Sequence, residues 1–346
     1  MKRRNFLKAV GGVTSGLALG AERVLGAEGP AAGLPRRVLG RTGRRLSVVG
    51  FPGLALVHYD QPRCNQAVRD ALERGVNYFD VAPAYGNGEA ETKMGIAMQG
   101  LDRGGYFLAC KTKMRDKDGA RLELERSLQR LKTDHFDLYQ MHHLVKPEEV
   151  KKALGPGGAI ETFLKAKEEG KVKHLGFSAH TTKAALEAMN GFQFDTVMFP
   201  INFVEFYLRG FGRDVLELAA QQGAAVLAIK PMSRGVWPKE VQRTREWWYR
   251  SVEEASEVQL AWRFTLSRTG VVAGIPPSFL DLLDKAIVAG RAYQPPTEAD
   301  LDQLQQIAKS CQSIFTREEA MVAAGWPCHE PIFPDSPHEC GGRGLV

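Results

Sequence analysis

Residues 106–142 read YFLACKTKMRDKDGARLELERSLQRLKTDHFDLYQMH and contain two buried-strand patterns separated by a helix pattern. Tyr106–Lys111 and Phe136–His142 are short runs that are apolar on both faces, which is typical of strands buried inside a parallel sheet. Ala120–Leu131 between them has the spacing of an amphipathic helix. A strand, a helix and a second strand in this order predict parallel strands joined by a right-handed crossover.

The same alternation continues on both sides of this unit. Six further runs have the buried-strand pattern: Leu46–Gly50, Val76–Val81, Lys173–Ser178, Thr196–Phe199, Ala224–Ile229 and Gly270–Ile275. Helix patterns follow them at Asn65–Arg74, Ala90–Gln99, Ala159–Glu169, Thr182–Met189, Gly212–Gln221, Val258–Ser267 and Leu280–Val288. Eight strand–helix units over about 250 residues predict a closed α/β barrel, a (β/α)₈ TIM barrel, in residues 36–290. No strand is followed by G-x-G-x-x-G, which argues against a Rossmann domain.

Segments outside the repeating units are expected to cap and extend this barrel. The turn at Gly40–Gly43 predicts a small β-hairpin that covers the barrel floor. Residues 291–346 form a C-terminal extension, in which Pro295–Phe315 is predicted to be one polar helix and Trp326–Val346 an irregular tail rich in proline and glycine.

The first 27 residues have the pattern of a targeting signal. Lys2–Lys8 places two arginines before Phe-Leu and a lysine, and a glycine-rich, mildly apolar stretch follows. This resembles a twin-arginine export signal, which predicts cleavage, the twin-arginine export machinery as a partner, and a periplasmic protein. The sequence does not choose between cleavage near Gly20 and near Gly26, and a short basic amphipathic leader is the alternative. The apolar stretch is shorter than the ~20 residues that span a bilayer, so stable membrane insertion is not expected.

The charge of the chain gives little support to nucleic-acid binding. The formal net charge is +6, but residues 1–27 carry +4 of it, which leaves +2 for the remaining chain. No basic run or basic aromatic stripe occurs in that part, so nucleic acid is not an expected partner.

The carboxyl ends of three consecutive predicted strands carry an acid, a phenol, an amine and an imidazole. Asp80 and Tyr85 come at and after the end of Val76–Val81, Lys111 ends the next strand, and His142 ends the one after that. The carboxyl ends of the strands form the face of a (β/α)₈ barrel that carries chemistry. We therefore expect the four side chains to meet at one mouth.

These groups suit proton donation to a carbonyl oxygen. A tyrosine with the ordinary pKa of about 10 is a poor acid at neutral pH. The Lys111 ammonium is expected to lower the pKa of Tyr85, Asp80 to hold that ammonium in place, and His142 to orient the carbonyl oxygen. No nucleophile is needed, which suggests that a cofactor supplies a hydride.

Together these residues resemble the aldo-keto reductase family. The resemblance is carried by D-x-A-x-x-Y-G at residues 80–86, by Lys111, by DLYQMH at 137–142 and by GKVKHLGFS at 170–178, and it runs from about Val38 to Val288. It implies a barrel enzyme that uses NADPH to reduce a small-molecule aldehyde or ketone. Asp80, Tyr85, Lys111 and His142 would be its catalytic tetrad, with Tyr85 as the acid.

The resemblance also places the cofactor against the ends of the later strands. The residues implied there are Ser178, Met198, Ile229, Lys230, Pro231, Ile275 and Ser278. Several positions depart from the family pattern: Ala179 replaces an asparagine, Met198 a glutamine and Ile229 a stacking aromatic. No arginine follows Ser278 at the position that would hold a 2′-phosphate, so NADH remains an alternative to NADPH.

Other interpretations of the same residues stay open. The altered cofactor positions also allow a non-catalytic barrel that binds a nicotinamide or a partner without turnover. A metal-dependent hydrolase using His142, His143 and His180 is disfavoured, because no paired carboxylate or H-x-H pattern accompanies these histidines. His143 is expected to point to the opposite strand face from His142, and His180 either to line the pocket or to lie in solvent. Trp247–Tyr249 either shape the pocket or simply pack.

No metal site is predicted in the tail. Cys311, Cys328 and Cys340 are 17 and 12 residues apart and contain no C-x-x-C pattern. A disulfide among these three is an alternative to free thiols, and the odd total of five cysteines leaves at least one thiol unpaired.

Overall fold

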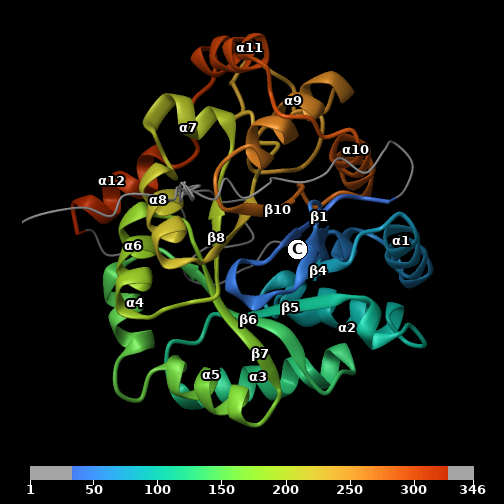
Figure 1. Cartoon of the computed structure of the whole chain (residues 1–346), viewed down its shortest axis with the longest axis vertical. Coiled ribbons are helices and arrows are strands. Elements are labelled where there is room, and N and C mark those ends of the chain that lie inside the picture. The colour runs from blue at the N-terminus through green and yellow to red at the C-terminus, as the bar shows by residue number, and fades with distance from the viewer. Residues whose placement is uncertain (1–32, 326–346) are drawn as a thin grey trace, which may run out of the picture. The chain divides into compact units, whose positions relative to one another are not determined.

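The computed structural model describes residues 33–325 and has an eight-stranded parallel sheet with helices packed around it (Figure 1). In pairing order the strands are β3 (Phe51–Pro52), β4 (Tyr78–Asp80), β5 (Phe107–Thr112), β6 (Phe136–Leu144), β7 (Val172–Ala179), β8 (Thr196–Pro200), β9 (Ala225–Ile229) and β10 (Val271–Ile275). The sheet closes because the Gly50 N–H donates to the Gly274 carbonyl at 2.8 Å and the Gly274 N–H donates to the Val48 carbonyl at 3.0 Å. The predicted (β/α)₈ barrel is confirmed.

Twelve α-helices are present in residues 33–325. They are α1 (Gln61–Glu73), α2 (Glu89–Ala97), α3 (Lys117–Leu131), α4 (Pro147–Leu154), α5 (Ala159–Glu168), α6 (Thr182–Gly191), α7 (Phe203–Arg209), α8 (Arg213–Gln222), α9 (Ala255–Leu266), α10 (Leu280–Arg291), α11 (Glu298–Lys309) and α12 (Thr316–Ala323). The sequence did not predict α4, α7 or α12, of which α4 and α7 are short and lie inside loops at the carboxyl ends of strands. None of these helices is both long and apolar enough to cross a membrane.

Helix α3 shows how local sequence sets the boundaries. The Asp116 carboxylate accepts a hydrogen bond from the Gly119 N–H at 2.8 Å and so caps the first turn, and the left-handed backbone of Lys132 ends the helix. The apolar stripe of Ala120, Leu124 and Leu131 is buried against the barrel wall.

A two-stranded antiparallel hairpin, β1 (Arg36–Val38) and β2 (Arg45–Ser47), plugs the barrel floor as predicted. Leu39 and Leu46 are fully buried and belong to the apolar cluster that fills the barrel interior together with Tyr78, Phe107 and Leu138.

The predicted first strand, Leu46–Gly50, has the wrong bounds. Leu46 and Ser47 belong to the hairpin, and the first barrel strand is Phe51–Pro52. The reason is a contact with the side chain of a residue that is distant in the sequence. The Ser47 N–H donates to the Asn77 side-chain oxygen at 2.7 Å, which fixes this segment beneath the barrel before the chain enters the wall.

The single helix predicted for Pro295–Phe315 is also wrong, because the helical segment breaks after Lys309. The buried carboxylate of Glu205, on α7, binds the segment after Lys309. It accepts hydrogen bonds from the Ser313 hydroxyl at 2.5 Å and from the Ile314 N–H at 2.9 Å. These bonds hold residues 311–315 out of helical geometry, and α12 starts afterwards.

Several predictions concern segments beyond the described residues. The export signal in residues 1–27, the tail from Trp326 to Val346, and Cys328 and Cys340 lie outside residues 33–325. Within that range Cys64, Cys110 and Cys311 are free thiols.

Asp137 ties the starts of three strands together on the floor side of the barrel. Its side chain is 1% exposed and accepts hydrogen bonds from the Leu108 N–H at 3.0 Å, the Arg103 guanidinium at 2.8 Å and the Lys173 ammonium at 3.2 Å. Burial alone would raise the pKa of Asp137, but these donors outweigh it and hold the pKa below its ordinary value.

We expect Asp137→Asn to lower the free energy of unfolding by about 1–3 kcal/mol at pH 7. A carboxyl whose pKa is depressed by folding stabilises the protein above its unfolded pKa of about 3.9, and this contribution is lost as pH falls through the folded pKa. Urea unfolding at pH 7 and near pH 3 should therefore show the gap between the two proteins shrinking in acid. Asp134→Asn, which alters a carboxylate with a 91% exposed side chain, is the control. An equal gap at both pH values would contradict the expectation.

Candidate active site

The structure brings Asp80, Tyr85, Lys111 and His142 together at the carboxyl ends of three adjacent strands. Strand register does this, because Asp80 pairs with Ala109 and Lys111 pairs with Gln140 in neighbouring strands. The Lys111 ammonium forms an ion pair with the Asp80 carboxylate and donates to the Tyr85 hydroxyl at 3.2 Å. It also donates to the Val81 carbonyl at 3.2 Å, so three oxygens surround this fully buried cation.

Tyr85 lies between the lysine and the histidine. Its ring meets the His142 ring edge to face, with centroids 5.6 Å apart and an interplanar angle of 87°. Lys111 Nζ is 4.9 Å from the centroid of the Tyr85 ring. Tyr85 and His142 are 8% and 2% exposed, so both are largely shielded from bulk water although they line a cavity.

The electrostatics fix the protonation of the lysine and the tyrosine. Burial opposes the charge of Lys111, but the charges of Asp80 and Tyr85 and their hydrogen bonds raise its pKa above the ordinary value. Burial also raises the pKa of Tyr85, by more than Lys111 lowers it. The lowering effect of Lys111 that the sequence suggested is present, but desolvation, which the sequence analysis did not consider, is larger and raises the pKa of Tyr85. At neutral pH the phenol keeps its proton and has one to donate.

Two residues that the sequence analysis did not single out support Asp80 from below. The Tyr78 hydroxyl donates to Asp80 Oδ2 at 3.1 Å, and Gln140 Nε2 donates to the same oxygen at 3.4 Å. Strand periodicity could have identified both residues. Residues two apart in a strand share a face, and Tyr78 is two residues before Asp80 and Gln140 two residues before His142.

A cavity, partly open to solvent, lies over these four residues. It is lined by the whole tetrad and by six of the seven residues predicted to hold a cofactor, namely Ser178, Met198, Ile229, Lys230, Ile275 and Ser278. Pro231, the seventh, is buried but does not line the cavity. Ser178 pairs with Met198 across β7 and β8, which places those two side by side.

The remaining wall comes from loops. Three aromatic residues, Trp247, Trp248 and Tyr249, are buried and also line the cavity. They therefore both pack and shape the pocket, the two roles that the sequence left open. Pro52–Leu54 and Pro276-Pro277 complete the lining and were not identified from sequence. Gly53 is required by close approach, because a Cβ there would lie 2.3 Å from the Asp80 carbonyl oxygen.

His143 is buried and does not line the cavity that His142 lines, and an irregular backbone directs its ring toward His180. The register of β6 against β7 shifts between Met141 and Leu144, and His143 has a left-handed backbone with φ of 59°. Such an irregularity re-aims a side chain. The His143 N–H donates to the Ser178 hydroxyl at 2.8 Å, and its ring contacts the His180 ring with centroids 4.3 Å apart.

His180 is buried and lines the cavity, which settles the choice left open for it. Its Nε2 is 3.2 Å from Lys230 Nζ, so a second buried lysine stands at the mouth. Burial lowers the pKa of Lys230 to about 7 against the opposing charges of Glu318 and Glu205. Glu318, on α12, is itself buried and its pKa is raised by burial to about 7.

Comparison with known proteins identifies the relatives of this chain. Residues 53–311 match the model of the aldo/keto reductase family. Aldo-keto reductase YhdN of Bacillus subtilis is 30% identical over 195 residues, covering 51% of this chain and 54% of its own length. L-galactose dehydrogenase of Arabidopsis thaliana is 26% identical over 214 residues, covering 58% and 66%. The chain thus spans between about half and two thirds of the length of such curated relatives.

Solved structures agree on the fold. The holo form of aldo-keto reductase AKR11C1 from Bacillus halodurans superposes with a TM-score of 0.66 at 22% identity, over 83% of this chain and 99% of that one. An aldo-keto reductase from Klebsiella pneumoniae in complex with NADPH gives a TM-score of 0.60 at 20% identity, over 78% and 94%.

Proposed function

Since the chain belongs to the aldo/keto reductase family, we propose that it reduces an aldehyde or ketone to an alcohol with a reduced nicotinamide cofactor. One observation carries the proposal: the Lys111 ammonium is 3.2 Å from the Tyr85 hydroxyl, beside His142, at the base of a cavity that can admit a small molecule. A non-catalytic barrel is the alternative, and it does not require the Tyr85 hydroxyl to lie beside this cation.

The residues at the mouth suit a nicotinamide cofactor. Ser178 offers a hydroxyl to a carboxamide, Met198 and Ile229 offer an apolar face, and Lys230 and Ser278 offer polar groups toward phosphate. When bound, the cofactor supplies the hydride. We propose NADPH, with NADH as the alternative to be distinguished by titration; relatives of the same fold have been solved with NADPH.

The chain's own residues supply the proton. Tyr85 donates its phenolic hydrogen to the carbonyl oxygen as negative charge develops there, and the Lys111 ammonium stabilises the phenolate that is left. Asp80 keeps Lys111 charged and in position. His142, whose ring edge meets Tyr85, orients the same oxygen. The buried mouth excludes water and strengthens each of these interactions.

A binding and turnover experiment tests the proposal. Trp247 and Trp248 line the cavity, so their fluorescence should change saturably as NADPH or NADH is added to the purified protein. Loss of nicotinamide absorbance with a panel of aldehydes and ketones should then report turnover. Binding without turnover on any carbonyl would favour the non-catalytic barrel, and absence of binding would contradict both functions.

We further propose that the protein is exported to the periplasm by the twin-arginine machinery. The support is the Arg3-Arg4 pair, the Phe-Leu that follows and the weakly apolar stretch after it. This route carries folded proteins, so a barrel could take a tightly bound cofactor with it. Replacing Arg3 and Arg4 with lysines should leave the protein in the cytoplasmic fraction of a twin-arginine-competent bacterium. An unchanged distribution would contradict export by this route.

A further inference from the structure

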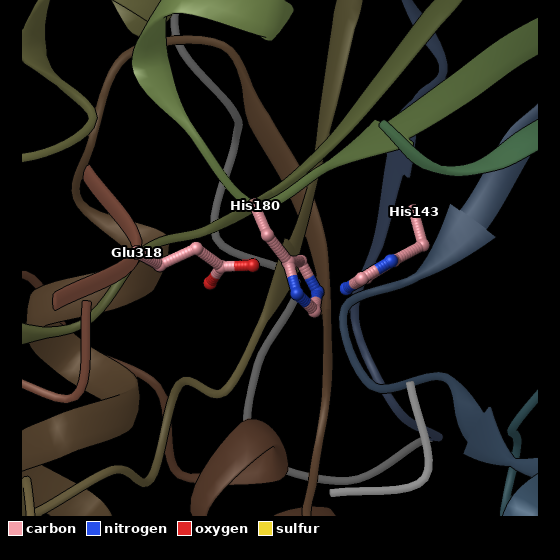
Figure 2. A group of neighbouring side chains, drawn as sticks. All are labelled: His143, His180 and Glu318. Atoms are coloured by element: carbon pink, nitrogen blue, oxygen red, sulfur yellow. The ribbon is translucent and has the colours of Figure 1, made fainter. Parts of the chain in front are cut away.

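A group of three metal-ligating side chains lies beside the catalytic mouth and has no part in carbonyl reduction. It consists of His143 near the end of β6, His180 just after β7, and Glu318 on α12 (Figure 2). All three are buried, and one potential ligand atom from each lies within 4.8 Å of the others. His180 stands between the carboxylate and the other imidazole, and only His180 also lines the cavity.

We propose that His143, His180 and Glu318 form a binding site for Zn²⁺ or a divalent transition metal of similar ligand preference. Two imidazoles and one carboxylate are the protein ligands of an open tetrahedral zinc site, which leaves the fourth position for water or a further ligand. The two nitrogen donors disfavour Mg²⁺ and Ca²⁺, which take oxygen ligands.

The backbone is arranged to bring these side chains together. His143 is one of four non-glycine residues with positive φ in residues 33–325, and its place at the register shift in β6 turns its ring toward His180. Glu318 reaches the same point from α12, which begins two residues after the Ile314 N–H that donates to Glu205. The ligand atoms of a tetrahedral zinc site are roughly 3.3 Å apart, so side-chain rotation must close the group by about 1.5 Å at most.

A lysine side chain already occupies the space beside His180. Lys230 Nζ lies 3.2 Å from His180 Nε2, and it faces the rings of Trp248 and Phe315 at 5.3 and 5.6 Å. Whenever this amine is protonated, its charge opposes a divalent ion at the shared imidazole. Metal binding therefore requires Lys230 to turn away from His180, and the two cations compete for one position.

The test measures Zn²⁺ affinity of the full chain after chelator treatment, by calorimetric titration with ZnCl₂. We expect one ion per chain at this site, binding at least about tenfold weaker in His143→Gln and in Glu318→Gln because each loses a ligand. Lys230→Met should bind more tightly than wild type, because the competing ammonium is gone. His174→Gln, which alters a partly buried histidine at the opposite end of β7, is the control and should match wild type.

A second readout keeps the test valid if a variant is unstable. Co²⁺ replaces Zn²⁺ in such sites, and its visible absorption in wild type should show four-coordinate geometry with no thiolate band. Zn²⁺ binding that is equal in wild type, His143→Gln and Glu318→Gln, or that disappears only in Cys311→Ser, would overturn the proposal. Carbonyl reduction by the chelated protein is measured in parallel, so loss of the metal site and failure of the reductase assignment give different results.

Discussion

Replacing Tyr85 with phenylalanine is expected to lower kcat for carbonyl reduction by about 10²- to 10⁴-fold. The variant loses the proposed proton donor, a hydroxyl that lies 3.2 Å from the Lys111 ammonium that would stabilise the resulting anion. Nicotinamide affinity should change little, because the residues proposed to hold the cofactor are other ones. Steady-state kinetics and fluorescence titration on the same preparation measure the two quantities separately.

Tyr78→Phe is a matched control for this variant. It removes the same hydroxyl from another tyrosine at the same cluster, one that donates to Asp80 at 3.1 Å but does not line the cavity. We expect it to cost about 1 kcal/mol of stability and to change kcat far less than Tyr85→Phe. Equal losses of kcat in both variants would show that Tyr85 acts through the structure of the cluster rather than as the proton donor.

The parts of this site that could be predicted from sequence are those fixed by strand periodicity. Asp80, Lys111 and His142 each lie at or within two residues of the carboxyl end of a strand, and parallel pairing puts these ends on one face, so their convergence follows from local patterns alone. Ser178 and Met198, which the family resemblance implied as cofactor contacts, lie side by side in the structure. The direction in which the pKa of Tyr85 shifts could not be predicted, because it depends on how completely the surrounding loops exclude water.

What the sequence concealed depends on contacts between distant residues. The shift in β6 that turns His143 inward has no signature in HHLV at residues 142–145, which fits a regular strand equally well. The carboxylate missing from the histidine group is supplied by Glu318, which is 138 residues after His180 and lies on a helix that was not expected as a separate element. The break before that helix depends on Glu205, more than 100 residues earlier.

Replacing Lys111 with methionine should abolish measurable reduction and also destabilise the protein by about 3–5 kcal/mol. Lys111 is fully buried, and the Asp80 side chain that it pairs with is only 4% exposed. Without the ammonium, the carboxylate is left in a dry site with two weaker donors, Tyr78 and Gln140. Urea unfolding at pH 7 measures the stability, and turnover at saturating cofactor measures the activity.

The double variant Asp80→Asn/Lys111→Met separates the structural role of the pair from its chemical role. Removing both charges together leaves no uncompensated ion in the barrel, and an asparagine oxygen can still accept from the Tyr78 hydroxyl. We therefore expect most of the lost stability to return. Activity should stay absent, because no cation remains next to Tyr85 to stabilise its phenolate. If the double variant recovered reduction along with stability, the lysine would be needed only to hold the barrel mouth together, and the proton-donor mechanism built on it would be wrong.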